Sequence, residues 1–264
     1  METVRLFGMP VAKVTRAEAV ERIVQIARER HAAGSGGRGS YFVATINVDF
    51  VCNAVPGWPF RGDRELWGYL KGADFVVADG MPLVLLSRLL RDPLPERVTG
   101  SDMVPELCAR FAEEGLPIYV LGGTAEALDA ALAKLREKSP SLKLAGSDHS
   151  RVSLDDDPAE TVGRINAARP AILFVALGNP KEELWMGRNA ASLDVPVMIG
   201  IGGSFNFIAG RVKRAPRWMQ RAGLEWIYRI CQEPGRLWRR YAYGLFKFSW
   251  LSLLTLCGAY REEK

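Results

Sequence analysis

Several features that identify common enzyme classes are scarce or absent in this sequence. The only two histidines, His31 and His149, stand far apart, so neither a zinc site nor a histidine-based catalytic triad is expected. No G-x-G-x-x-G motif follows a strand pattern, which disfavours a nucleotide-sugar dehydrogenase or epimerase that holds a dinucleotide. We therefore expect neither a metal ion nor a cofactor.

Cysteine and long apolar runs are also sparse. The N-terminus, METVRLFGMPVAKV, is interrupted by Glu2 and Arg5, so no signal peptide is expected. The longest apolar run near the C-terminus, at 244–260, contains Lys247 and is shorter than the roughly 20 residues of a membrane span. We expect a helix there that either packs on the protein or lies at a membrane interface. Four scattered cysteines are expected to be reduced core thiols: Cys52, Cys108, Cys231 and Cys257.

What the chain does have is a local excess of basic charge. Its net charge is +5, yet the segment from Arg211 to Lys247 alone holds ten Lys or Arg against two acids, Glu225 and Glu233. The remainder is slightly acidic, so the basic segment indicates a site for an anionic partner. With 264 residues, 48% of them hydrophobic, the chain can form one large domain or a domain with an appendage.

Five apolar segments are typical of buried strands, and most of them lead into helical patterns. Strands of this kind alternating with amphipathic helices predict an α/β fold with a parallel sheet covered on both faces. Ligands of such sheets bind at the carboxyl ends of the strands, and here those ends are small, polar or acidic, which suits a nucleotide or a sugar. The segments are 40–47, 74–80, 117–124, 171–180 and 196–205.

Two strand ends have alternative interpretations. The sequence Gly122-Gly123-Thr124 either binds a phosphate through amides at a helix N-terminus or forms a tight turn. In GNPKEE at 178–183, Asn179 can cap a helix with Pro180 in its first position, while Lys181 can meet a ligand phosphate. The acids Glu182 and Glu183 either bond sugar hydroxyls or complement the helix dipole.

Carboxylates give further candidates. Asp79 ends an apolar strand and is either a general base or a helix cap, and spacing alone favours the cap. Asp102 has the same ambiguity, and Arg97 nearby can hold a phosphate. Asp155-Asp156-Asp157 resembles a metal-binding D-x-D motif, but it lies in a polar segment at 147–158 and is expected to be a solvated loop.

The basic segment has two competing functional interpretations. Arginine and tryptophan recur at helical spacing from Arg214 to Glu233, which is typical of a solvated amphipathic face or of a helix at a lipid surface. The number of tryptophans and the apolar run that follows favour the membrane. An RNA-binding module is the alternative, since such modules also interleave arginine with aromatic residues, although no RNA-binding motif is present.

Six motifs together resemble one family over roughly residues 5 to 245. They are ATINVDFV, VADGMPLV, ERVTGSDM, VLGG, GNPKEELWM and GIGGSFNFIAGRVKRAPRWMQRAGLEWIYRICQEPGRLWRRY. In this order they are similar to the WecG/TagA/CpsF family, glycosyltransferase family 26. The resemblance implies a Rossmann-like α/β sandwich of the GT-E type over residues 1–205. It also implies a basic, helical appendage over residues 206–264 that docks on the membrane and completes the active site.

The resemblance also implies a reaction and a set of residues. Members are inverting transferases that move a sugar from a UDP donor to a sugar on a lipid diphosphate, in the synthesis of polysaccharides, exopolysaccharides or wall polymers. Asp79 matches the proposed base. Substrate binding is expected of Thr45, Asn47, Arg97, Gly100, Asp102, Gly122, Gly123, Gly178, Pro180, Lys181, Glu182, Glu183, Gly203, Arg214, Arg221, Glu225 and Arg229. Membrane contact is expected of Arg217, Trp218, Trp226, Trp238, Arg239 and Arg240.

Two departures bear on the donor. Glu182 stands where the family often has Gln, and Asn206 stands where it usually has Asp. The donor is therefore left open between UDP-N-acetylmannosamine and UDP-glucose. The expected partners are the UDP-sugar, the lipid-diphosphate acceptor and an anionic membrane surface, without nucleic acid, and self-association stays open. The expected location is peripheral, on the cytoplasmic face of the inner membrane.

Overall fold

The computed structural model describes residues 1–34, 39–149, 152–221, 223–232 and 234–260. The side chains of Arg217, Arg221, Arg236 and Leu237 also lie outside the described residues.

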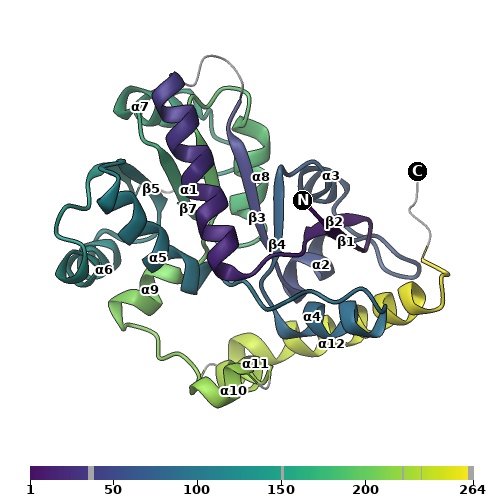
Figure 1. The fold of residues 1–264 in the computed structure, drawn as a ribbon. Helices are drawn as coiled ribbons and strands as arrows, with labels where there is room; N and C mark the ends of the chain where they lie inside the picture. The colour runs from purple at the N-terminus through teal and green to yellow at the C-terminus, as the bar shows by residue number, and fades with distance from the viewer. Residues whose placement is uncertain (35–38, 150–151, 222, 233, 261–264) are drawn as a thin grey trace.

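A sheet of eight strands forms the centre of the molecule, in the order β1-β2-β4-β3-β8-β7-β5-β6 (Figure 1). β1 pairs antiparallel with β2, and every other pairing is parallel. The strands are β1 Thr3–Leu6, β2 Met9–Ala12, β3 Tyr41–Ile46, β4 Phe75–Ala78, β5 Ile118–Gly122, β6 Leu144–Asp148, β7 Ile172–Ala176 and β8 Val197–Gly200.

Helices cover both faces of this sheet. One core lies beneath α1, α5, α6 and α9, and the other beneath α2, α3, α4, α7, α8 and part of α12. The helices of the first layer are α1 Arg16–Ala33, α5 Gly100–Glu113, α6 Ala125–Lys138 and α9 Ser204–Ala209. Those of the second layer are α2 Val48–Ala54, α3 Arg64–Lys71, α4 Met81–Leu89, α7 Ala159–Ala168, α8 Lys181–Asn189 and α12 Pro234–Leu256. Two further helices, α10 Arg217–Arg221 and α11 Glu225–Gln232, lie at the edge of the molecule (Figure 1).

Side chains along each central strand point alternately to the two faces of the sheet, and this produces the two cores. In β7, Ile172 and Phe174 enter one core while Leu173 and Val175 enter the other, because successive side chains point to opposite faces. A strand buried on both faces must be apolar throughout, which explains why these segments appear as continuous hydrophobic runs. The predicted α/β sandwich with a parallel sheet is confirmed, and β3, β4, β5, β7 and β8 lie within the five expected segments.

Several local expectations were wrong. The hairpin of β1 and β2 was not expected, and β6 includes the first two residues of the segment 147–158 that was expected to be a polar connection. Pro180 is the N-cap of α8 rather than its first residue, and no side chain caps that helix. Cys231 and Cys257 are exposed, so only Cys52 and Cys108 are core thiols.

The C-terminal helix α12 has two different faces. Lys247, Phe248 and Leu251 are buried against the second core, whereas Leu245 and Phe246 are exposed. The Nζ of Lys247 donates to the carbonyls of Cys52, at 2.7 Å, and Arg61, at 3.0 Å. The apolar run therefore packs on the protein along one face and leaves the other face uncovered. Across the described residues, no helix combines the length and apolar character needed to cross a membrane.

Candidate active site

A cavity of about 610 Å³ opens where β3 and β4 end, between α4 and the C-terminal segment. Its volume lies within the roughly 300–1,000 Å³ of typical ligand sites. Predicted site residues that line it come from both parts of the chain: Asn47, Asp79, Arg97, Arg214, Glu225, Trp226 and Arg229. The C-terminal appendage therefore supplies part of the cavity wall.

Asp79 follows β4 directly and faces this cavity. The N-cap of α4 is Gly80, and no side chain caps that helix, so the helix-cap interpretation of Asp79 is wrong. Burial raises the pKa of Asp79 to about 6, the charge of Arg97 opposes this shift, and the charge of Glu225 adds to it. A carboxylate with such a pKa is mostly ionised at neutral pH, yet it is more basic than an ordinary Asp, which suits a general base.

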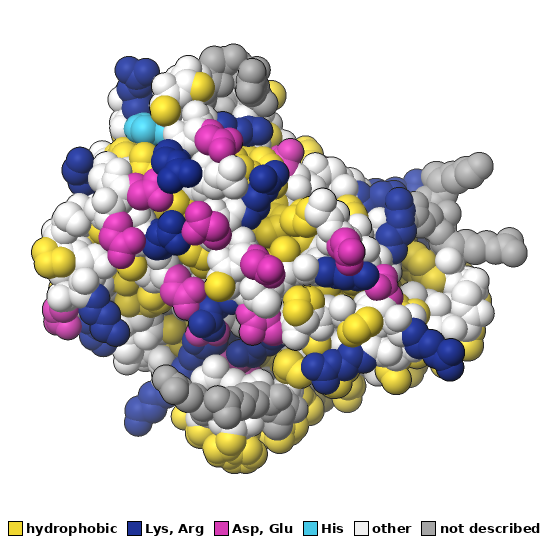
Figure 2. All heavy atoms as spheres, in the orientation of Figure 1, with side chains coloured by type: hydrophobic (Ala, Val, Ile, Leu, Met, Phe, Trp, Pro, Cys, Tyr) yellow, Lys and Arg dark blue, Asp and Glu magenta, His cyan; other side chains and the backbone are white. Residues whose placement is uncertain are grey.

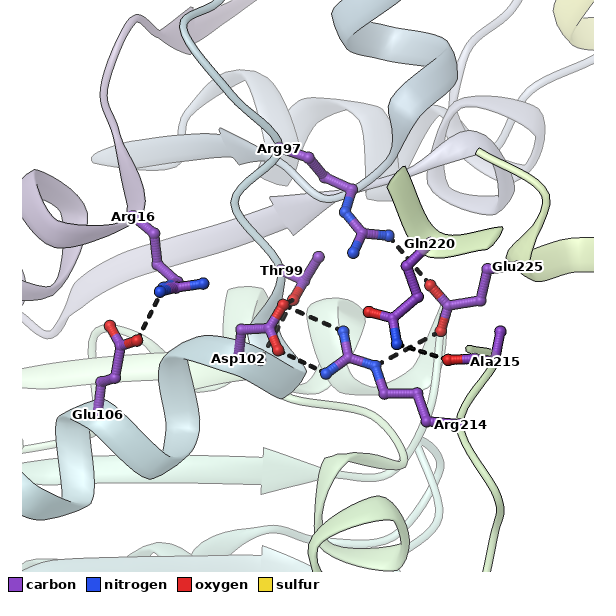
Figure 3. Close-up of polar contacts among 9 residues, drawn as sticks. All are labelled: Arg16, Arg97, Thr99, Asp102, Glu106, Arg214, Ala215, Gln220 and Glu225. Atoms are coloured by element: carbon purple, nitrogen blue, oxygen red, sulfur yellow. Dashed lines mark hydrogen bonds and ion pairs between the residues drawn. The ribbon is translucent and has the colours of Figure 1, made fainter. Parts of the chain in front are cut away.

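A network of ion pairs joins the appendage to Arg97, in the segment before α5, and to Asp102 on α5 (Figure 3). Glu225 accepts a hydrogen bond from Nη1 of Arg97 at 3.0 Å, and its other oxygen lies 3.7 Å from Nε of Arg214. The two terminal nitrogens of Arg214 donate to the two carboxylate oxygens of Asp102. Although burial raises the pKa of Asp102, hydrogen bonds from Arg214 and Thr99 outweigh it and lower the pKa overall.

Ion pairs and one ring contact hold three guanidinium groups near Asp79. Arg97 and Arg214 each have a carboxylate partner, and Arg229 stacks over the ring of Phe207 with its Cζ 5.0 Å from the centroid. Nε of Arg214 is buried, and although it lies near the carboxylate of Glu225 it makes no hydrogen bond among the described residues.

The predicted pocket pair, Thr45 and Asn47, lies at the end of β3. The hydroxyl of Thr45 is buried and donates to the carbonyl of Gly200 at 3.4 Å. Oδ1 of Asn47 accepts from the amides of Asp49 and Phe50 and caps α2, so its Nδ2 group is the part suited to a ligand. Gly100 adjoins this pair, because a Cβ atom there would lie 3.8 Å from Oγ1 of Thr45.

The remaining glycine-bearing strand ends do not line this cavity. Gly122 has φ +90°, and a Cβ there would lie 2.7 Å from the carbonyl oxygen of Ala176, so the close approach of β5 and β7 requires glycine. Thr124 caps α6 by accepting from the amide of Ala127. The turn interpretation is therefore sufficient for Gly122 and Gly123, and phosphate binding there stays a prediction. Ligand contact also stays a prediction for Gly178 and Lys181 in the β7–α8 loop and for Gly203 in the β8–α9 loop.

Glu182 and Glu183 lie beneath these loops and are both buried. Oε2 of Glu182 accepts from the amides of Gly178 and Gly202, each at 3.0 Å, and Glu183 accepts from Nδ2 of Asn179. Burial raises the pKa of both, and for Glu183 the neighbouring charge of Glu182 adds to the effect. Through these hydrogen bonds, Glu182 and Glu183 connect the loops that follow β7 and β8, a role that the sequence did not indicate.

The residues expected at the membrane divide into three groups. Trp218 and Trp238 are 65% and 51% exposed, whereas Trp226 lines the cavity. Arg239 stacks on Trp238, and Arg240 forms an ion pair with Asp49 on α2. The side chain of Arg217 lies outside the described residues, as does that of Arg221, which was expected to bind substrate. Figure 2 shows hydrophobic side chains gathered along the lower edge of this face, over α10–α12.

The sequence did not predict the apolar wall of the cavity. It consists of side chains on α4 and α12 that are mostly three or four residues apart, a spacing that gave no sign that the two helices would face one another. These residues are Leu85, Leu86, Leu89, Leu245, Phe248, Leu253 and Leu256.

The acidic run at 155–157 forms a turn before α7. Asp156 accepts from the amide of Ser153, and Asp157 accepts from the amide of Ala159, so the expectation of a solvated loop is confirmed. Within the described ranges no group of three or more His, Cys, Asp or Glu is placed to hold a metal ion.

Known proteins are similar to this chain over most of its length. A family model described as the glycosyl transferase WecG/TagA/CpsF family matches residues 4–262. The N-acetylglucosaminyldiphosphoundecaprenol N-acetyl-beta-D-mannosaminyltransferase of Bacillus subtilis (strain 168) is 32% identical over 198 residues, covering 75% of this chain and 73% of that protein. A protein of the same name from Staphylococcus aureus (strain MW2) is 33% identical over 208 residues, covering 78% of each.

Proposed function

The chain belongs to the WecG/TagA/CpsF family, as its motifs predicted, and is a glycosyltransferase; on that premise we propose that it transfers a sugar from a UDP donor to a sugar on a lipid diphosphate. The transferred group is a hexose or an N-acetylhexosamine, with UDP-N-acetylmannosamine and UDP-glucose as the two candidate donors. The observation that carries the proposal is Asp79, a carboxylate with a raised pKa that faces a cavity beside Arg97, Arg214 and Arg229.

The proposed step is a single displacement with inversion. A hydroxyl oxygen of the acceptor sugar attacks the anomeric carbon of the donor, and Asp79 takes the hydroxyl proton as the new carbon–oxygen bond forms. The bond between that carbon and the UDP oxygen breaks, and UDP leaves with the electron pair. Guanidinium groups are suited to the negative charge of diphosphates, since they present paired donors in a fixed geometry.

The appendage is proposed to bring the enzyme to its acceptor. A lipid diphosphate stays at the bilayer surface, so the enzyme must bind there, on the cytoplasmic face of the inner membrane. The exposed rings of Trp218 and Trp238 suit the headgroup region, and basic residues near an anionic surface contribute about 1 kcal/mol each. Synthesis of a polysaccharide, an exopolysaccharide or a wall polymer is the process proposed for this reaction.

The test is transfer from a panel of radiolabelled UDP-sugars to N-acetylglucosamine on a short-chain lipid diphosphate. We expect one donor to be used, and the product's anomeric configuration to be opposite to the donor's. Absence of a lipid-linked product with every donor, or retention of configuration, would overturn the proposal. The RNA-binding alternative has no support from the comparisons. Only tight binding of single-stranded RNA, together with no sugar transfer, would favour it.

A further inference from the structure

The cavity beside Asp79 has a second region that sugar transfer does not use. Its polar floor holds Asp79 and the arginines, but it continues between α4 and α12, where the walls are mostly apolar. Neither a sugar nor UDP needs such walls. The two regions belong to one cavity, so a ligand that occupies both must be polar at one end and apolar at the other.

The apolar walls are two facing stripes of side chains. Leu85 and Leu89 are one helical turn apart on α4, and Leu253 and Leu256 share a face of α12 with Ser249 and Ser252. Leu89 and Leu253 are 66% and 52% exposed, although Phe248, next along the groove, is buried. Exposed apolar side chains that line a groove mark a binding surface rather than a folding requirement.

We infer that this groove between α4 and α12 binds the first part of the acceptor's polyprenyl chain, next to its diphosphate. The inference rests on the proposed function and deepens it, since it assigns a place to the lipid part of the acceptor. The diphosphate lies against the arginines of the floor, and the chain attached to it enters the groove and leaves it beside the exposed leucines. A second copy of this chain would not need the polar floor, which is why the lipid is the occupant that fits.

The groove has a consequence for substrate choice. Contact with a chain adds affinity only for acceptors that carry one, so the enzyme distinguishes a lipid diphosphate from a free sugar diphosphate even away from a membrane. This separates the role of the groove from adsorption of the outer face of α12 to a bilayer, because the groove acts on a single dissolved molecule.

Two groove variants, Leu89→Gln and Leu253→Gln, test the inference in vesicle-free solution. Both residues are exposed, so the substitutions leave the core unchanged. The matched control is Phe246→Gln, an exposed apolar residue of α12 that does not line the cavity. Each protein is assayed with two acceptors that carry the same sugar diphosphate, one esterified to farnesol and one to ethanol.

With the farnesyl acceptor, the KM of each groove variant is expected to rise about tenfold, the effect of losing contact with roughly two methylene groups. With the ethyl acceptor, KM and kcat should match those of the unmodified protein, and Phe246→Gln should match it with both acceptors. An unchanged KM for the farnesyl acceptor, or an equal rise for both acceptors, would overturn the inference.

A binding measurement separates failure of this inference from failure of the proposed function. Farnesyl diphosphate and inorganic diphosphate are titrated into the same proteins by calorimetry, which requires no activity. The groove variants should bind farnesyl diphosphate about tenfold more weakly and inorganic diphosphate equally well. If the unmodified protein transfers no sugar but shows this pattern, the proposed function falls while the groove assignment stands. Equal binding of farnesyl diphosphate by all variants would disprove the groove assignment and leave the proposed function untouched.

Discussion

Replacement of Asp79 by Asn is the sharpest test of the catalytic assignment. The substitution keeps the size of the side chain and removes its basicity, so the acceptor hydroxyl loses its proton acceptor. General-base assistance of this kind is worth about 10²–10⁴-fold, and the turnover of Asp79→Asn should fall by a factor in that range. Binding of UDP should persist, because the arginines of the cavity are unchanged.

The pH profile gives the same assignment a second, independent readout. The pKa of Asp79 is raised to about 6, and the ionised form is the base, so activity should rise with pH and level off above pH 6. At pH 7 the ionised form exceeds the protonated form about tenfold, and below pH 5 the rate should fall about tenfold per pH unit. Glu225 contributes to the raised pKa, so Glu225→Gln should shift this acid limb to lower pH.

The assay is radiolabel transfer measured from pH 4.5 to pH 8.5 with saturating donor and acceptor. Asp129→Asn, at an exposed position on α6, is the matched control and should leave both the rate and the profile unchanged. Near-normal turnover of Asp79→Asn, or an acid limb that survives in this variant, would refute the assignment. Loss of UDP binding in Asp79→Asn would show that the substitution disturbs the site beyond the base.

Three further predictions concern stability, membrane binding and metal dependence. Burial raises the pKa of Glu182, so this residue gives stability that is present below its ordinary pKa and lost as pH rises through the raised pKa. Glu182→Gln should reduce this loss, of which the raised pKa of Glu183 keeps a part. The Tm of Glu182→Gln should therefore exceed that of the unmodified protein more at pH 8 than at pH 5, and parallel pH dependence would contradict this. Replacement of both Trp218 and Trp238 by Ser should weaken sedimentation with anionic vesicles, and binding should also weaken as salt rises; undiminished sedimentation would disprove their role. Transfer should persist in EDTA, and a loss of activity that magnesium restores would refute metal independence.

The central strands could be predicted because their burial on both faces is reflected in their amino-acid composition. A parallel strand that is buried on both faces must be apolar at every position, as in AILFVA at 171–176, so β3, β4, β5, β7 and β8 were recognisable. The hairpin of β1 and β2 and the outer strand β6 lie toward the two edges of the sheet. β1 alternates between exposed and buried residues, and β6 is largely half-buried, so neither strand is apolar throughout.

The candidate site was only partly predictable, and for a different reason. Polar residues at strand ends meet because parallel strands share an edge, so Asn47 and Asp79 could be expected together. The pairings of Arg214 with Asp102 and of Glu225 with Arg97 connect residues more than a hundred positions apart, and no local pattern specifies them. The same holds for Arg240, whose partner Asp49 on α2 could not be inferred from the helical spacing of the appendage.

The packing of α12 shows how the C-terminal segment is joined to the sheet. Phe248 and Leu251 belong to the same core as α2 and α4, and a Cβ atom at Gly57 would lie 2.5 Å from Cδ2 of Leu251. Burial lowers the pKa of Lys247, whose ammonium nonetheless holds the carbonyls of Cys52 and Arg61. One face of α12 therefore completes the fold, while side chains on its other positions line the cavity or remain exposed. A single helix thus contributes to the core, the cavity and the exposed face. Point substitutions at its exposed positions can therefore separate membrane binding from catalysis. Removal of the whole C-terminal segment would expose the core as well.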